Sequence, residues 1–164
     1  MTKKIALLDL LATHQFNYQM HEHEPVFTVE EGKHLSEKIA GAHSKNLFLK
    51  DKKKAYFLVS VLEYKRVDLK ALSKQYGKGG LSFANADELL EKLQLTPGSV
   101  TPYALFHDKN NEITFILDED FLKYDIVNFH PMQNDLTLSM AIEPFMRFFD
   151  VIAHQPLLIK IPEL

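Results

Sequence analysis

Two apolar runs joined by a short basic turn constrain the fold of this chain more than any other sequence feature. In the first run, residues 45–50, alternation puts the side chain of Lys45 on one face of an extended segment and that of Asn46 on the other. The turn is Asp51-Lys52-Lys53-Lys54, and the second run, residues 55–62, is almost wholly apolar. Apolar runs on both sides of a polar turn predict a β-hairpin with a basic tip.

The rest of the chain alternates between helical and extended patterns. We expect helices at about residues 2–13, 28–40, 69–76, 86–93 and 143–152, and further strands at about 18–21, 104–107, 113–117, 126–129 and 136–140. Because the pattern lacks a strict βαβ repeat, an α+β class is favoured, with one mixed sheet flanked by helices. At 164 residues, the chain has the length of one domain, and we assign residues 1–164 to it.

Composition excludes several classes of function. The chain has no cysteine, so disulfides, thiol catalysis and thiolate metal sites are ruled out. No run approaches the ~18 apolar residues of a membrane span, and we expect a soluble, cytoplasmic protein. The net charge of -3 argues against nonspecific binding of nucleic acid, although lysines crowd the hairpin tip. From the residues alone, such a charge run is most simply a solvated face.

Three local patterns have alternative chemical interpretations. Ser44-Lys45 pairs a hydroxyl with an amine, but no Gly-x-Ser-x-Gly elbow surrounds it. His21 and His23 would share a strand face as a metal pair, but a convincing third ligand for zinc is missing. The segment Gly77-Lys78-Gly79-Gly80 lacks the spacing of a Walker loop. We therefore expect neither a metal nor any other cofactor.

Four motifs in order resemble the YbaK/ProX family of aminoacyl-tRNA deacylases. They are Val26-Phe27-Thr28-Val29-Glu30-Glu31, Lys45-Asn46-Leu47-Phe48-Leu49-Lys50-Asp51, Gly98-Ser99-Val100-Thr101-Pro102 and Phe129-His130-Pro131. The sequence is most similar to the ProXp-ala branch, the free-standing relatives of the prolyl-tRNA synthetase editing domain. The resemblance extends over nearly the whole chain and implies the fold of that domain.

The resemblance also implies roles for individual residues. Lys45, Asn46 and His130 match catalytic positions of the family: the lysine would hold a phosphate or polarise the ester, and the asparagine would orient ribose or water. The expected substrate-binding residues are Phe27, Thr28, Gly98, Ser99, Val100, Thr101 and Pro102. RNA binding is expected at the hairpin tip, from Lys50, Lys52, Lys53 and Lys54.

The implied reaction is hydrolysis of the ester between a wrong amino acid and its tRNA, with alanine on proline tRNA as the expected substrate. No residue resembles a strong general base, so water attack assisted by the ribose hydroxyl of the substrate is favoured. The expected partners are mischarged tRNA and prolyl-tRNA synthetase, without a membrane. The alternatives are a deacylase for cysteinyl- or seryl-tRNA and a non-catalytic module that binds tRNA or docks on a synthetase.

Overall fold

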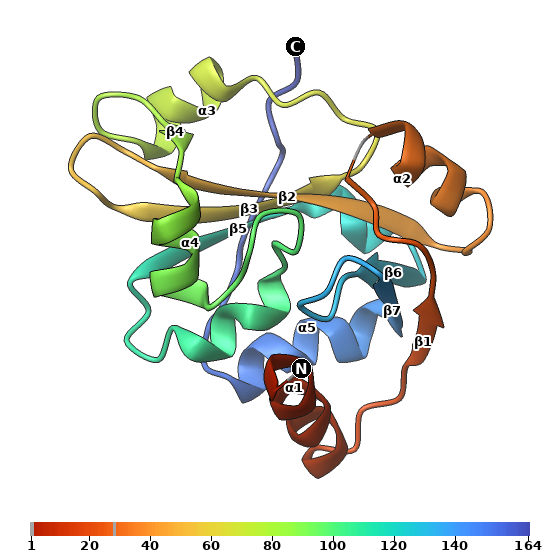
Figure 1. The fold of residues 1–164 in the computed structure, drawn as a ribbon. Helices are drawn as coiled ribbons and strands as arrows, with labels where there is room; N and C mark the ends of the chain where they lie inside the picture. The colour runs from red at the N-terminus through yellow and green to blue at the C-terminus, as the bar shows by residue number, and fades with distance from the viewer. Residues whose placement is uncertain (1, 28) are drawn as a thin grey trace.

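The computed structural model describes residues 2–27 and 29–164, apart from the side chains of residues 2, 3 and 29 (Figure 1). In chain order, the elements are α1 (Thr2–Thr13), β1 (Gln19–Glu22), α2 (Val29–Ser36), β2 (Ala42–Lys50), β3 (Tyr56–Leu62), α3 (Leu69–Tyr76), β4 (Ser82–Phe83), α4 (Ala86–Leu93), the 3-10 helix η1 (Pro102–His107), β5 (Ile113–Asp118), the 3-10 helix η2 (Glu119–Lys123), β6 (Ile126–Phe129), β7 (Leu136–Ala141), α5 (Ile142–Val151) and β8 (Leu157–Ile159).

The strands form one mixed sheet in the order β1-β7-β6-β2-β3-β5-β8, with β4 beside the end of β2. Pairing is parallel between β2 and β6, between β3 and β5, and between β5 and β8, and it is antiparallel elsewhere. The predicted α+β class with a mixed sheet and flanking helices is therefore confirmed. None of the described helices is long and apolar enough to cross a membrane.

The predicted hairpin is the antiparallel pair β2 and β3, in which Lys45 lies opposite Val61 and Asn46 opposite Ser60. The other edge of β2 is only partly paired: β6 meets Ala42 and His43, and β4 meets Leu49 and Lys50. Between them, no strand of the described chain pairs with residues 44–47. Along a strand, the backbone N–H and C=O groups of successive residues point alternately to the two edges. The C=O of His43 accepts a hydrogen bond from the N–H of Glu63 on the β3 side. Asn46, three residues later, therefore turns its own N–H and C=O to the unpaired edge.

Apolar side chains pack on both faces of the sheet. On one face, α1, α4, η1 and α5 cover the larger core, whose centre is an aromatic cluster in which Phe129 stacks on Phe145 with ring centroids 4.7 Å apart (Figure 1). On the other face, Leu72 of α3 packs over β2 and β3. Each fully buried side chain of this size contributes about 1.5–3 kcal/mol, which makes the sheet a firm support for residues at its edge.

The helix caps follow the sequence closely. Asp68 accepts a hydrogen bond from the N–H of Ala71 at the start of α3. Asn85 and Glu88 form a capping box at the start of α4, with each side chain accepting from the other residue's backbone N–H. The segment Thr28-Val29-Glu30-Glu31 also has the residue types of a capping box, but Thr28 lies outside the described residues.

Two sequence-based expectations are wrong in detail. Residues 104–107, predicted as a strand, belong to the 3-10 helix η1, because Thr101 caps its start and Pro102 supplies a helical φ at the first position. The helix expected at about residues 28–40 is also shorter in the structure, where α2 ends at Ser36. In α1, Leu7 and Leu11 are buried, whereas Ile5 is exposed. The strands β4 and β8 were not predicted, since two or three residues are too short to show a period.

Candidate functional site

A cavity of about 190 Å³ lies at the gap in the pairing of β2. It is lined by Ser44, Lys45, Asn46, Gly98, Val100 and His130. All three expected catalytic residues are therefore together, although 84 residues separate Asn46 from His130 along the chain. The fold brings them together because β6, which ends just before His130, runs parallel to the start of β2.

Lys45 supplies a partly shielded positive charge at this cavity. Its side chain is half-buried, and burial lowers its pKa below the ordinary value. The nearby guanidinium of Arg66 lowers the pKa further, while the carboxylate of Glu63 partly offsets both effects. Among the described residues, Lys45 has no carboxylate within ion-pair distance. A cation in this setting is available to an anionic or developing negative group of a ligand.

Asn46 is held by hydroxyl groups on both sides of its amide. The hydroxyl of Ser60 on β3 donates to Oδ1 of Asn46 at 2.5 Å. The Nδ2 of Asn46 donates to Oγ of Ser44 at 3.4 Å. The amide therefore enters the cavity with a fixed orientation.

The hydroxyl of Ser44 donates its hydrogen bond to a backbone carbonyl and not to a basic side chain. Its hydroxyl donates to the backbone C=O of Asn128 at 2.9 Å. A serine that donates to a carbonyl has no group to remove its proton, so the structure gives no support to the nucleophile interpretation of Ser44-Lys45.

Asn128 anchors the start of β2 from inside the core. Its Nδ2 donates to the C=O of Ala40 and of Ala42, and its Oδ1 accepts from Ser139. Gly41, between the two carbonyls, has a φ of +104°, and a Cβ there would lie 2.8 Å from the C=O of Ile126. Only glycine can bring its backbone this close to the C=O of Ile126. This close contact sets the position at which β2 enters the site.

His130 presents one known tautomer to the cavity. Its Nδ1 lies 2.7 Å from the C=O of Leu136, and since a carbonyl only accepts, Nδ1 carries the hydrogen. Burial lowers the pKa of His130 despite this bond, and the charges that His23 and His43 can carry lower it further. The ring is therefore neutral at pH 7, and Nε2 is an acceptor.

The loop at Gly98 forms the opposite wall. Gly98 has a φ of +89°, and a Cβ there would lie 3.7 Å from the ring of Phe27, which is 71% exposed. Phe27 therefore lies at the rim beside the loop, not in the core. Ser99 is buried, and the buried hydroxyl of Thr101 accepts a hydrogen bond from the N–H of Tyr103 as the cap of η1. These two side chains therefore hold the loop in place from the protein interior.

The remaining expected substrate-binding residues have different positions. Pro102 is buried in the first turn of η1, outside the cavity lining. Thr28 lies outside the described residues. Within the loop, Gly98 and Val100 are the residues that reach the cavity.

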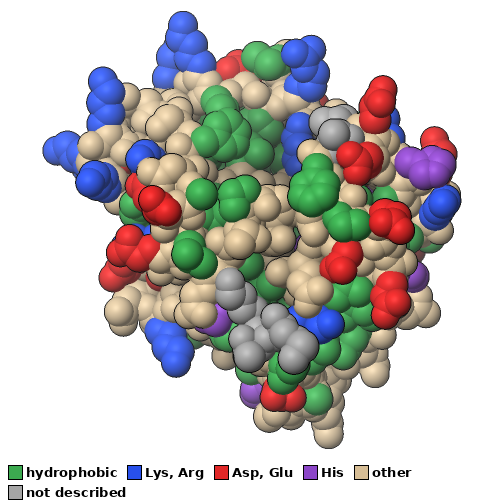
Figure 2. Space-filling model, in the orientation of Figure 1, with side chains coloured by type: hydrophobic (Ala, Val, Ile, Leu, Met, Phe, Trp, Pro, Cys, Tyr) green, Lys and Arg blue, Asp and Glu red, His purple; other side chains and the backbone are tan. Residues whose placement is uncertain are grey.

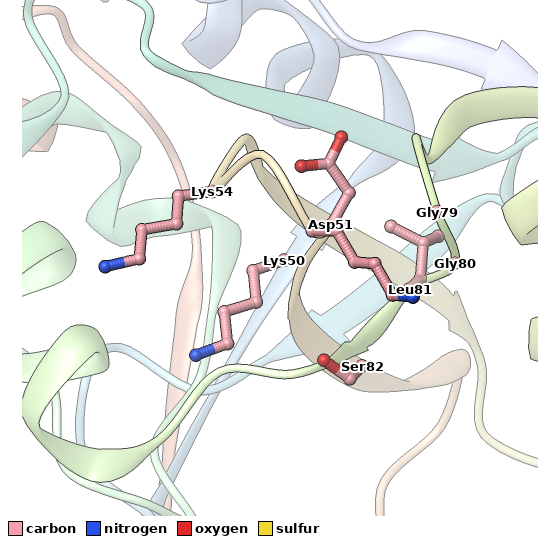
Figure 3. Close-up of a pocket in the computed structure, with 8 residues that line it drawn as sticks. Lys50, Asp51, Lys54, Gly79, Gly80, Leu81 and Ser82 are labelled. Carbon is pink, nitrogen blue, oxygen red and sulfur yellow. The ribbon is translucent and has the colours of Figure 1, made fainter.

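The basic hairpin tip forms a second, larger cleft of about 370 Å³ with the loop after α3 (Figure 3). Lys52, Lys53 and Lys54 are exposed, and lysine side chains protrude around this end of the hairpin at the left of Figure 2. Asp51 points away from Lys50 and Lys54, and its carboxylate accepts from three backbone N–H groups, which shape the turn.

Lys50 differs from the other lysines of the tip. Its Nζ bonds Oε1 of Glu88 at 2.8 Å, and the hydroxyl of Tyr56 donates to the other oxygen. The N–H of Asn85, Lys50 and Tyr56 together lower the pKa of Glu88 to about 2. Lys50 is therefore already paired within the protein, which the sequence did not reveal.

One of the two histidines considered as a metal pair, His23, has other contacts. His23 bonds the C=O of Glu24 and the hydroxyl of Thr137, and its ring lies 6.2 Å from that of His130. Within residues 2–27 and 29–164, no group of three or more histidine, aspartate or glutamate side chains is arranged to hold a metal ion.

The family model for the aminoacyl-tRNA editing domain matches residues 23–148, which include every residue that lines the smaller cavity. The chain belongs to this family. As a member of it, the chain is an aminoacyl-tRNA hydrolase of the YbaK/ProX group, as the motifs predicted.

Full-length relatives agree with this assignment. The chain is 47% identical to the prolyl-tRNA synthetase associated domain-containing protein 1 of Xenopus laevis, over 84% of each chain. It is 33% identical to the prolyl-tRNA editing protein ProX of Acetoanaerobium sticklandii, over 87% of this chain and 88% of that one. A solved structure described as a candidate trans-editing enzyme for prolyl-tRNA synthetase has the same fold, with a TM-score of 0.69, 20% identity and coverage of 100% and 99%.

Two residues at the site escaped the sequence analysis. Ser60 and Asn128 are buried polar residues that fix the position of Asn46 and of β2. The only available signal was a polar residue inside an otherwise apolar strand pattern, and that signal does not reveal its partner.

Proposed function

We propose that this editing enzyme acts in trans to hydrolyse alanine from proline tRNA. The observation that carries the proposal is the cavity of about 190 Å³ between β2, the Gly98 loop and His130. Pockets that enclose drug-sized ligands have volumes of about 300–1,000 Å³. The cavity is smaller, so it suits the aminoacyl end of the substrate while the terminal nucleotide stays outside.

A small cavity supports selection by size. A synthetase pocket built for proline discriminates poorly against a smaller amino acid, since a missing methylene changes binding by only about 1–3 kcal/mol. A second site that excludes the larger residue by steric overlap reverses the preference. Gly98 keeps its wall close to Phe27, where any side chain would be strained by the positive φ. We propose that the walls leave room for the methyl group of alanine beside the bound ester but not for the proline ring.

The three polar groups of the cavity suggest a division of labour in hydrolysis. We assign to Lys45 the stabilisation of negative charge that develops on the ester as water attacks. We assign to His130 a contact through Nε2, which accepts a proton or hydrogen bond from the substrate. Asn46 orients the ester or ribose. The attack of water is assisted by the neighbouring ribose hydroxyl of the substrate, because none of these side chains is a strong base at neutral pH.

The names of two relatives support proline tRNA as the carrier. One is a prolyl-tRNA editing protein, and the other is named for association with prolyl-tRNA synthetase. We propose the same tRNA, and docking near that synthetase, for this chain. The exposed lysines at the hairpin tip are proposed to meet tRNA phosphates.

The test is a deacylation panel on one tRNA. Proline tRNA charged with alanine, serine, cysteine or proline is incubated with the enzyme, and the rates are compared with spontaneous hydrolysis. The proposal expects alanine to be removed fastest and proline to be spared. If cysteine or serine is removed fastest, that amino acid replaces alanine as the proposed substrate. Binding of tRNA without hydrolysis would indicate a docking module.

A further inference from the structure

Ser60 is a polar residue at a position that the packing makes apolar. Every residue of β3 is buried, and the other six are hydrophobic. Ser60 itself has no exposed surface. Burying a hydroxyl without a hydrogen bond is unfavourable, so the bond to Asn46 is the compensating contact. Asn46 and Ser60 lie directly opposite each other across the hairpin.

The direction of every hydrogen bond around Asn46 follows from one carbonyl. The C=O of Asn128 only accepts, so the Ser44 hydroxyl donates its single hydrogen there. Oγ of Ser44 must then accept from Asn46, which places Nδ2 of the amide on that side. Oδ1 therefore faces Ser60, whose hydroxyl donates to it. The oxygen and nitrogen of an asparagine amide are assigned from their hydrogen-bond partners, and here the network allows only one assignment.

We propose that Ser60 is a positioning residue that locks Asn46 as a hydrogen-bond donor toward the substrate. The proposal rests on the hydrolase function of the cavity. Nδ2 carries two hydrogens, and the network uses one of them for Ser44. The second serves the cavity that Asn46 lines, where it takes an acceptor oxygen of the aminoacyl ester.

The distances indicate that Ser60, more than Ser44, holds the amide. The contact of Asn46 with Ser60 is 2.5 Å, whereas the contact with Ser44 is 3.4 Å and correspondingly weak. Ser60 also belongs to a fully buried strand, so its position varies little. Without the Ser60 hydroxyl, the Asn46 amide rotates and the donor spends less time in the productive direction.

The test is a double-mutant cycle on hydrolysis of the aminoacyl-tRNA that the wild-type enzyme cleaves fastest. Ser60→Ala should lower kcat about tenfold with little change in KM. In an Asn46→Ala background, Ser60→Ala should have almost no further effect, because its partner is gone. The control is Ser73→Ala on α3. This substitution also removes a hydrogen-bonded serine hydroxyl, which donates to the C=O of Leu69 and accepts from the N–H of Leu81. It should leave kcat unchanged.

Two more variants separate positioning from packing. Ser60→Thr retains the hydroxyl and should recover most of the lost rate. Asn46→Asp retains the size and the acceptor facing Ser60 but removes the donor, so it should lose more activity than Ser60→Ala. Equal losses from Ser60→Ala in the wild-type and Asn46→Ala backgrounds would overturn the proposal, since they would show that Ser60 acts through packing.

A measurement without substrate checks the same claim. The side-chain NH₂ signals of Asn46 in a ¹⁵N NMR spectrum are assigned by their loss in Asn46→Asp. They should shift in Ser60→Ala and stay in place in Ser73→Ala. Unshifted Asn46 signals in a folded Ser60→Ala protein would refute the positioning role, whatever the substrate is. If the wild-type enzyme instead fails to hydrolyse alanyl-tRNA but hydrolyses another aminoacyl-tRNA, only the proposed amino acid would be wrong.

Discussion

Nζ of Lys50 bonds Oε1 of Glu88 at 2.8 Å and so joins the end of β2 to the first turn of α4. The pairing divides the basic hairpin tip into one internally neutralised lysine and three exposed ones. Counterion release by RNA phosphates requires cations that are not already paired. The exposed lysines therefore carry the expected RNA contact, and Lys50 contributes less than its place in the sequence suggests.

A triple variant, Lys52→Ala with Lys53→Ala and Lys54→Ala, should weaken tRNA binding and flatten its salt dependence. The slope of log K against log salt should fall by about 2–3, since each lost phosphate contact contributes about 0.7–0.9. Lys50→Ala should change this slope little. Binding measured from low to high salt checks both, and an unchanged slope in the triple variant would restore the interpretation of a solvated face.

Lys45→Ala should lower kcat/KM at least about a hundredfold while the protein stays folded. The ammonium lies at the open edge of β2, where its loss removes charge stabilisation without opening the core. Lys70→Ala, an exposed lysine on α3, is the matched control and should be neutral. Circular dichroism and deacylation rates are compared, and near-normal turnover in the folded Lys45 variant would remove this residue from the mechanism.

Activity should fall in acid as His130 takes up a second proton. Burial lowers its pKa from the ordinary value of 6.5, so the ring is neutral at pH 7 and gains its charge only at a pH below that value. Protonation converts the Nε2 acceptor into a donor. His130→Ala should lower the rate about tenfold and abolish this acidic limb, and a rate that rises in acid would show that the charged ring is the active form.

Hydrolysis should persist after treatment with EDTA, because we assign no step to a metal. The measurement is the deacylation rate before and after chelation, with zinc added back as a control. Loss on chelation and recovery with zinc would require His21 or His23 to be reconsidered as ligands.

Sequence patterns predicted the parts of the structure that local rules determine. The hairpin and the helices α3, α4 and α5 follow from periodicity and from local hydrogen bonds such as the caps at Asp68 and Asn85. Family motifs predicted which residues meet in the cavity, and Lys45, Asn46 and His130 do meet there. The structure leaves their chemical roles as predictions.

Long-range pairing accounts for what the sequence did not reveal. The choice of Glu88 as the partner of Lys50, and of Asn46 as the partner of Ser60, depends on which strands and helices lie side by side. η1 was mistaken for a strand because an apolar run of four residues has no distinctive period, and the decisive cap at Thr101 precedes it.

Selectivity by size is the central claim, and one comparison tests it most directly. The rates at which the wild-type enzyme hydrolyses alanyl- and prolyl-tRNA are measured on the same proline tRNA, together with those of Phe27→Ala. We expect alanine to be released at least about a hundredfold faster than proline, and Phe27→Ala to narrow that difference by opening the rim beside Gly98. Equal wild-type rates on the two substrates would contradict the account.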